Sequence, residues 1–245
     1  MPDPTLTNDC LSAAYILSLG LVLGIKHALE ADHIAAIATI VSERKSLLSS
    51  CLVGALWGLG HTVALLAAGV AVILLHLESG RRTALVLEFG VALMLVALGA
   101  NALRKLLCGG KLHLHAHRHG ERLHAHPHIH AAAPDPPQMH HGSRLATQPL
   151  VVGMVHGLAG SAALMLLVLA TIPSPLVGFA YLAVFGAGSA GGMLCMSALM
   201  GLPVQLTGRY FSGADVAVRT LAGLFSLGLG VFMAYRIGFV EGLFL

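Results

Sequence analysis

Six long apolar runs constrain the fold of this chain more than any other feature of its sequence. They cover positions 11–41, 52–75, 83–103, 149–171, 176–202 and 216–237. A helix needs about 20 predominantly apolar residues to cross a hydrocarbon core of about 30 Å. Charged residues make up 10% of the chain, against about 25% in an ordinary soluble domain. The sequence therefore predicts an all-α integral membrane protein with six transmembrane helices.

The first run is too long and too polar for a regular span. As one helix, positions 11–41 would reach about 46 Å, well beyond the hydrocarbon core. Its second half also carries five ionisable residues: Lys26, His27, Glu30, Asp32 and His33. We expect this helix to be broken or strongly tilted.

Short sequence matches indicate that the chain is internally duplicated. The matches pair Gly24-Ile-Lys-His27 with Gly153-Met-Val-His156, and Gly58-Leu-Gly60-His61 with Gly186-Ala-Gly188-Ser189. Three apolar runs in each half is an odd number, so the second half must enter the membrane from the opposite side. This predicts an inverted 3+3 repeat of the kind found in secondary transporters. The expected units are a first three-helix repeat over 1–107, a disordered histidine-rich loop over 108–148 and a second repeat over 149–245.

Lysine and arginine predict the orientation, because cytoplasmic loops carry an excess of both. Most of these residues follow the first, third and fifth runs: Arg44, Lys45, Arg104, Lys105, Lys111, Arg118, Arg122, Arg144 and Arg209. Both termini are then outside a bacterial cytoplasmic membrane, and the loop between the halves is cytoplasmic. The net charge of +3 is small and lies in the loops, so we expect lipid contacts and no nucleic-acid partner.

The ionisable cluster in the first run predicts a metal site. An ionisable residue at mid-membrane costs about 2.5–3.5 kcal/mol on insertion scales, so it usually faces a partner or a polar cavity. On an intact helix His27, Glu30 and His33 share one broad face and Asp32 points elsewhere. A break would instead bring Asp32 to the two histidines, and the excess length favours the break. The alternative is an internal hydrogen-bond network without metal.

Two further histidines are candidates for the same site. His61 lies within the second run beside glycines that permit close helix approach. His156 is the repeat mate of His27, but its half lacks the acidic residues, so its role as a ligand stays open, as does that of Glu30. Imidazole with carboxylate suits Ni²⁺, Co²⁺, Zn²⁺ or Cu²⁺, and ligand type alone does not choose among them.

The loop between the halves is rich in alternating histidines. They are His113, His115, His117, His119, His124, His126, His128 and His130, followed by His140 and His141. Alternation places each quartet on one side of an extended chain, where adjacent imidazoles can share a metal. We interpret the loop as a flexible segment that captures, buffers or senses metal, the alternative being a solvated low-complexity linker.

The stretch Lys26-His27-Ala-Leu-Glu30-Ala-Asp32-His33-Ile34 resembles the signature of the nickel/cobalt transporter family, His-x4-Asp-His in an Arg-His-Ala-x-Asp-Ala-Asp-His-Ile context. Leu59-Gly60-His61-Thr62 is similar to the Leu-Gly-His-Ser of that family's next span. The second half lacks the Gly-Phe-Asp-Thr motif of the family's best-known members and looks more like the six-span urease-accessory nickel transporters. The resemblance implies transport of nickel or cobalt by His27, Asp32, His33 and His61.

The sequence favours a secondary transporter over other classes of protein. It has no Gly-x4-Gly-Lys-Ser/Thr phosphate loop, no His-Glu-x-x-His zincin motif and no clear base for a nucleophilic serine. We therefore predict no enzymatic activity and no cofactor, and the family resemblance implies Ni²⁺ or Co²⁺ as the transported ion. Uptake, as nickel supply to metalloenzymes such as urease, is favoured over efflux for metal resistance. A membrane metal sensor and a membrane-embedded hydrolase are remote alternatives, and a metallochaperone at the loop and a homo-oligomer stay open as partners.

Overall fold

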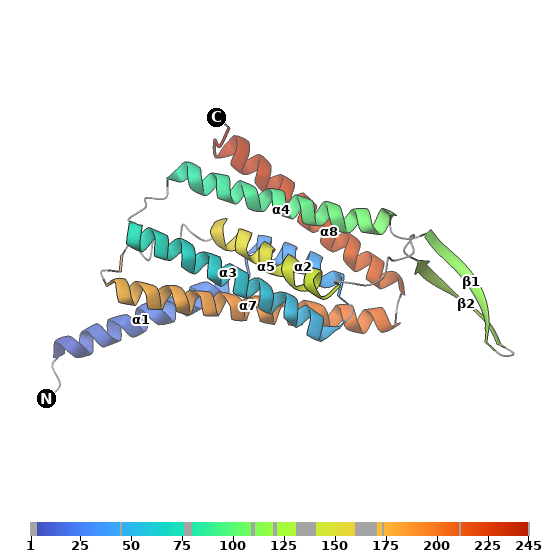
Figure 1. The fold of residues 1–245 in the computed structure, drawn as a ribbon, viewed down its shortest axis with the longest axis horizontal. Coiled ribbons are helices and arrows are strands. Elements are labelled where there is room, and N and C mark those ends of the chain that lie inside the picture. Colours follow the sequence, from blue (N-terminus) through green and yellow to red (C-terminus); the bar gives the residue numbers. More distant parts are fainter. Residues whose placement is uncertain are drawn as a thin grey trace.

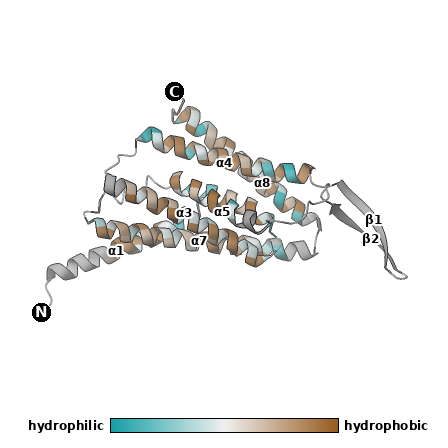
Figure 2. Cartoon of the chain, in the orientation of Figure 1, coloured by the Kyte–Doolittle hydropathy of each residue, from teal (hydrophilic) through white to brown (hydrophobic). Residues whose placement is uncertain are grey.

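The computed structural model is a helical bundle with one β-hairpin (Figure 1). It describes residues 4–44, 46–75, 80–108, 111–119, 122–130, 141–159, 171–172, 174–210 and 212–244. The elements are α1 (Pro4–His27), α2 (Ala31–Ser42), α3 (Leu47–Leu75), α4 (Arg81–Cys108), β1 (Lys111–His119), β2 (Arg122–His130), α5 (His141–Ala159), α7 (Pro175–Tyr210), α8 (Ser212–Tyr235) and the π-helix η1 (Arg236–Val240). Hydrophobic residues run along the helices, and hydrophilic ones gather mainly at the ends of α4 and α8 (Figure 2).

The helices identify a multi-pass membrane protein. Four segments are long and apolar enough to cross a membrane: Leu47–Ala71, Arg81–Cys108, Pro175–Pro203 and Asp215–Val240. The bent pair Ala14–His27 and Ala31–Ser42 raises the number of candidate spans to five if the pair is counted as one span. The expected six spans are therefore not confirmed within the described residues. The fourth apolar run begins in α5, and its positions 160–170 lie outside those residues.

The break expected in the first apolar run is present. The axes of α1 and α2 differ by 54°. At the break the amides of Leu29 and Glu30 donate to the carbonyls three residues earlier, and Glu30 then adopts an extended conformation with ψ 150°. Neither Pro nor Gly stands between His27 and Ala31, although these residues cause most sharp kinks. Only the excess length and the polar residues of the run predicted the break.

The two halves of the chain are interleaved, because α1 packs against α7 and α5 packs against α3. A Cβ atom added at Gly24 of α1 would lie 2.2 Å from the carbonyl oxygen of Phe185 on α7. One added at its repeat mate, Gly153 of α5, would lie 2.2 Å from the carbonyl oxygen of Trp57 on α3. Only glycine allows the backbones to approach so closely.

Other glycines of the repeat also contact a helix of the opposite half. A Cβ atom at Gly60 of α3 would lie 2.3 Å from the Leu150 carbonyl oxygen, and one at Gly188 of α7 would lie 2.6 Å from the Leu21 carbonyl oxygen. Helices α4 and α8 form a third close pair across the halves, through Gly99 and Gly230. The glycine contacts therefore occur in equivalent pairs that join one half of the chain to the other.

In the histidine-rich segment the structure describes two antiparallel strands, β1 over residues 111–119 and β2 over residues 122–130. The register pairs His113 with His128, His115 with His126 and His117 with His124. The hairpin projects beyond one end of the bundle (Figure 1). Helix α5 begins at His141, earlier than the apolar run that predicted it, so the predicted loop over 108–148 is partly helical at its end.

Candidate metal site

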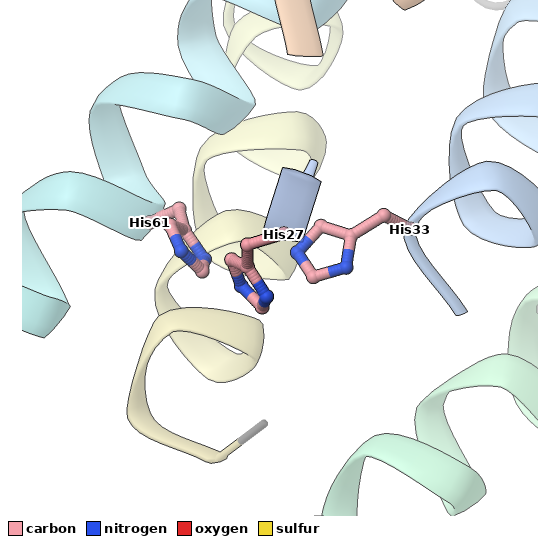
Figure 3. Close-up of side chains that lie close together, drawn as sticks. All are labelled: His27, His33 and His61. Carbon is pink, nitrogen blue, oxygen red and sulfur yellow. The ribbon is translucent and has the colours of Figure 1, made fainter. Parts of the chain in front are cut away.

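Four helices bring one histidine each into the centre of the bundle. His27 is the last residue of α1, His33 lies in the first turn of α2, and His61 and His156 lie within α3 and α5. All four side chains are buried, with exposed fractions of 3% for His27 and 0% for the others. Three of the rings converge from α1, α2 and α3 in Figure 3. Membrane burial of four imidazoles at one point indicates a functional site.

The rings lie close enough to share a cation. The centroid of His27 is 4.4 Å from that of His33 and 5.1 Å from that of His61. His27, His33 and His61 offer ligand atoms that all lie within 4.8 Å of one another. Asp32, His33 and His156 form a second set that meets the same limit. The two sets share His33, so the five residues form one continuous cluster.

Asp32 connects α2 to α5. Its Oδ2 atom lies 2.8 Å from Nε2 of His156, and its Oδ1 atom lies 3.3 Å from Nδ1 of His33 and accepts the His33 backbone N–H at 3.0 Å. The break between α1 and α2 thus brings Asp32 to the histidines. This is the broken-helix alternative of the sequence analysis and not the face of an intact helix.

Six imidazole nitrogens of the cluster have no hydrogen-bond partner among the described residues. They are both ring nitrogens of His27 and of His61, Nε2 of His33 and Nδ1 of His156. A buried polar atom without a partner costs about 1–3 kcal/mol. A divalent cation would accept the nitrogen lone pairs, and the Asp32 carboxylate would offset part of its charge. The donor set therefore fits a transition-metal ion of the Ni²⁺, Co²⁺, Zn²⁺ or Cu²⁺ group.

Glu30 lies at the edge of this cluster. Its Oε2 atom is 3.0 Å from Nδ1 of His27, in a geometry that does not form a hydrogen bond, and its side chain is 41% exposed. It belongs to neither of the two sets of convergent ligands. Glu30 is the acidic residue through which the cluster reaches the surface of the described structure.

Aromatic rings enclose the histidines. Trp57 of α3 is fully buried, and its ring centroid lies 6.1 Å from that of His33 and 5.7 Å from that of His156. The ring centroid of Phe185 on α7 lies 5.8 Å from that of His27. Trp57 was not among the residues predicted for the site, although it is the single tryptophan of the chain and stands one helical turn before His61. That spacing is the signal that could have identified it.

A glycine contact sets the separation of α3 and α5 at the cluster. A Cβ atom at Gly157 would lie 2.4 Å from the carbonyl oxygen of His61. Any larger residue at position 157 would therefore push the two helices apart, and with them His61 and His156. The sequence around His61 and His156 therefore supplies both the ligands and the close helix approach that brings them together.

The loop histidines are separate from this cluster. Eight of them belong to the hairpin outside the bundle, and His141 is the first residue of α5. His140 lies outside the described residues.

The chain is similar to a curated protein. It is 38% identical over 236 residues to the urease accessory protein UreH from Bacillus sp. (strain TB-90), and the match covers 96% of this chain and 97% of that protein. No family model matches the chain. No solved structure matches it either.

Proposed function

Because this chain belongs to the family of the urease accessory protein UreH, we propose that it is a secondary transporter that moves Ni²⁺ or Co²⁺ across the cytoplasmic membrane. The observation that carries the proposal is the buried cluster of four histidines and Asp32 within a bundle of apolar helices. Ionisable residues that are buried among membrane helices usually mark the pathway of an ion or substrate, whereas a metal site that served only the aqueous phase would not need this position. The chain acts as a transport protein and not as an enzyme, and the metal is its substrate.

His27, Asp32, His33 and His61 bind the ion during transport, with His156 completing the site through Asp32. Glu30 is the first or last ligand that the ion meets, because its carboxylate is partly exposed and lies 3.0 Å from His27. Imidazole ligands favour late first-row divalent ions over Mg²⁺ and Ca²⁺, which prefer oxygen. Nickel is the first candidate among these ions, since the relative is a urease accessory protein.

The transporter is an inverted 3+3 repeat with six spans. Support comes from the equivalent glycine contacts, in which Gly24 meets α7 as Gly153 meets α3, and Gly60 meets α5 as Gly188 meets α1. Secondary transporters built in this way bind their substrate near the midplane, at discontinuous helices. The break between α1 and α2 lies at the cluster and has this character.

Both termini face outward and the histidine-rich hairpin faces the cytoplasm, as the distribution of Lys and Arg indicates. The hairpin captures metal on the cytoplasmic side with its eight histidines, and it is a place where a metallochaperone would collect the ion. Transport runs inward and supplies nickel to urease or another metalloenzyme, driven by an ion gradient or the membrane potential.

Nickel accumulation tests the function and its direction together. A host that lacks nickel import would express the wild type or Asp32→Asn, with an empty vector as the baseline, and radiolabelled nickel would be counted over time. Uptake predicts accumulation above the baseline with the wild type and near the baseline with the variant. Wild-type accumulation below the baseline would show efflux, and equal flux with and without Asp32 would exclude the proposed site.

A further inference from the structure

The hydroxyl group of Thr39 joins the ligand-bearing helix α2 to α8. Its Oγ1 atom lies 3.1 Å from the carbonyl oxygen of Ala222 on α8 and 2.9 Å from that of Ala35 in its own helix. The side chain is buried, with 3% exposed. Thr39 comes two helical turns after Asp32, so it lies on the same face of α2 as that carboxylate.

Three of the four histidines lie on helices that glycines hold in backbone contact. His27 follows Gly24, which meets α7, while His61 follows Gly60 and His156 precedes Gly157, and these two glycines join α3 and α5. Such contacts leave little room for one helix to shift against another. Helices α1, α3, α5 and α7 therefore form one tightly packed frame, and it contains both halves of the chain.

Helix α2, which carries Asp32 and His33, is held differently. Among the described glycines, none has its close neighbours within Ala31–Ser42. The helix is separated from α1 by the break, and it packs most extensively against α8 and α7. Its position relative to the frame therefore depends on side-chain contacts and on the Thr39 hydrogen bond.

Helices α4 and α8 form a second unit. Gly99 and Gly230 bring their backbones together, and the Ser226 hydroxyl on α8 donates to the carbonyl oxygen of Leu95 on α4 at 3.0 Å. Thr39 thus attaches α2 to a helix pair that is distinct from the frame carrying the other three histidines.

We propose that Thr39 is a positioning residue of the metal site, which holds α2 on α8 so that Asp32 and His33 meet His27, His61 and His156. When the site opens, α2 moves with the α4–α8 pair, and the carboxylate and one imidazole leave the frame together. A movement of the first half of the sequence against the second would instead break the glycine contacts between α1 and α7 and between α3 and α5. The inference rests on the proposed function in that the cluster binds the transported ion.

Nickel binding to the purified full-length protein tests this role by isothermal titration. Thr39→Val keeps the side-chain shape and removes the hydroxyl. Because one neutral buried hydrogen bond contributes about 0.5–1.5 kcal/mol, we expect the Kd for Ni²⁺ to rise by about two- to tenfold. Thr39→Ser keeps the hydroxyl and should restore the wild-type Kd. If Thr39→Val is not recovered folded, Thr39→Ala removes the same hydroxyl without adding volume, and the same rise is expected.

Ser226→Ala is the matched control, since it removes a buried interhelical hydroxyl inside the α4–α8 pair. Both variants should lower the nickel-free melting temperature by a similar small amount, but only the Thr39 variant should weaken nickel binding. An unchanged Kd in Thr39→Val, or an equal rise in Ser226→Ala, would overturn the positioning role while wild-type binding still supported the transporter. Absence of nickel binding to the wild type would overturn the proposed function and the positioning role with it.

Discussion

Asp32 Oδ2 lies 2.8 Å from His156 Nε2, although the two residues are 124 positions apart and belong to opposite halves of the chain. Asp32 also contacts His33. One carboxylate therefore connects His156 of the second half to His33 of the first. This contact joins the two halves of the chain at the candidate metal site.

The Asp32 carboxylate should be indispensable for metal binding. Asp32→Asn preserves the side-chain volume and removes the negative charge, so the cation would lose its charge partner among the buried imidazoles. We expect Ni²⁺ affinity to fall by at least tenfold in titration of the purified protein. Asp215→Asn, which removes the carboxylate of the half-exposed pair with Arg219, is the control and should bind nickel like the wild type. Equal affinities in all three proteins would contradict the assignment.

His61 should stabilise the nickel-bound protein and not the nickel-free one. Both of its ring nitrogens lack hydrogen-bond partners among the described residues, and replacing such a group by an apolar one of similar shape can be neutral or stabilising. At a nickel concentration 100 times the Kd, the wild type should gain about 2.7 kcal/mol. His61→Leu should lose most of this gain and keep the nickel-free melting temperature, as thermal unfolding with and without nickel would show.

Ser197→Ala is the control for that experiment. Its hydroxyl is also buried without a hydrogen-bond partner among the described residues, but Ser197 belongs to neither set of convergent ligands. Nickel should stabilise this variant as much as the wild type. A loss in Ser197→Ala equal to that in His61→Leu would assign the effect to general loosening of the bundle.

Gly24 and Gly153 should be equally intolerant of a methyl group. A Cβ atom at either position would lie 2.2 Å from a carbonyl oxygen of the neighbouring helix, and such overpacking costs about 1–3 kcal/mol. Each Gly→Ala variant should therefore yield less folded protein and a lower melting temperature. Gly90→Ala, where a Cβ atom would meet nothing within 4 Å, should be neutral. Tolerance of alanine at Gly24 would mean that α1 and α7 are not in backbone contact.

The hairpin register should determine how the loop binds metal. The register pairs three histidines of β1 with three of β2: His113 with His128, His115 with His126 and His117 with His124. Exchanging each β2 histidine with the residue before it keeps the composition and removes these three histidine pairings. We expect fewer nickel ions to bind the purified variant by equilibrium dialysis.

Transport separates this role from that of the buried cluster. Replacing the eight hairpin histidines by alanine should leave the initial rate of nickel accumulation largely unchanged, because the cluster in the bundle is intact and the hairpin lies on the side of the membrane where the ion is released. Complete loss of accumulation would contradict a capture role for the hairpin.

The local features of the candidate site could be predicted from the sequence. Four ionisable residues within seven positions of an overlong apolar run indicate a broken helix around a cation, because the cost of burying each charge is a property of the segment itself. The break is present between His27 and Ala31. The hairpin was missed because low-complexity composition indicates disorder, whereas strand pairing depends on contacts between two segments.

The sequence by itself therefore determined that this is a membrane protein with a buried cluster at His27, Asp32 and His33, since hydropathy and charge burial act over short stretches of chain. The tertiary structure decided that His61 and His156 meet them, and that His156 pairs with Asp32. These meetings depend on helix crossings between distant segments, which the glycine contacts allow but do not specify alone. Only the packing of α2 on α8 revealed Thr39 as a part of the same arrangement.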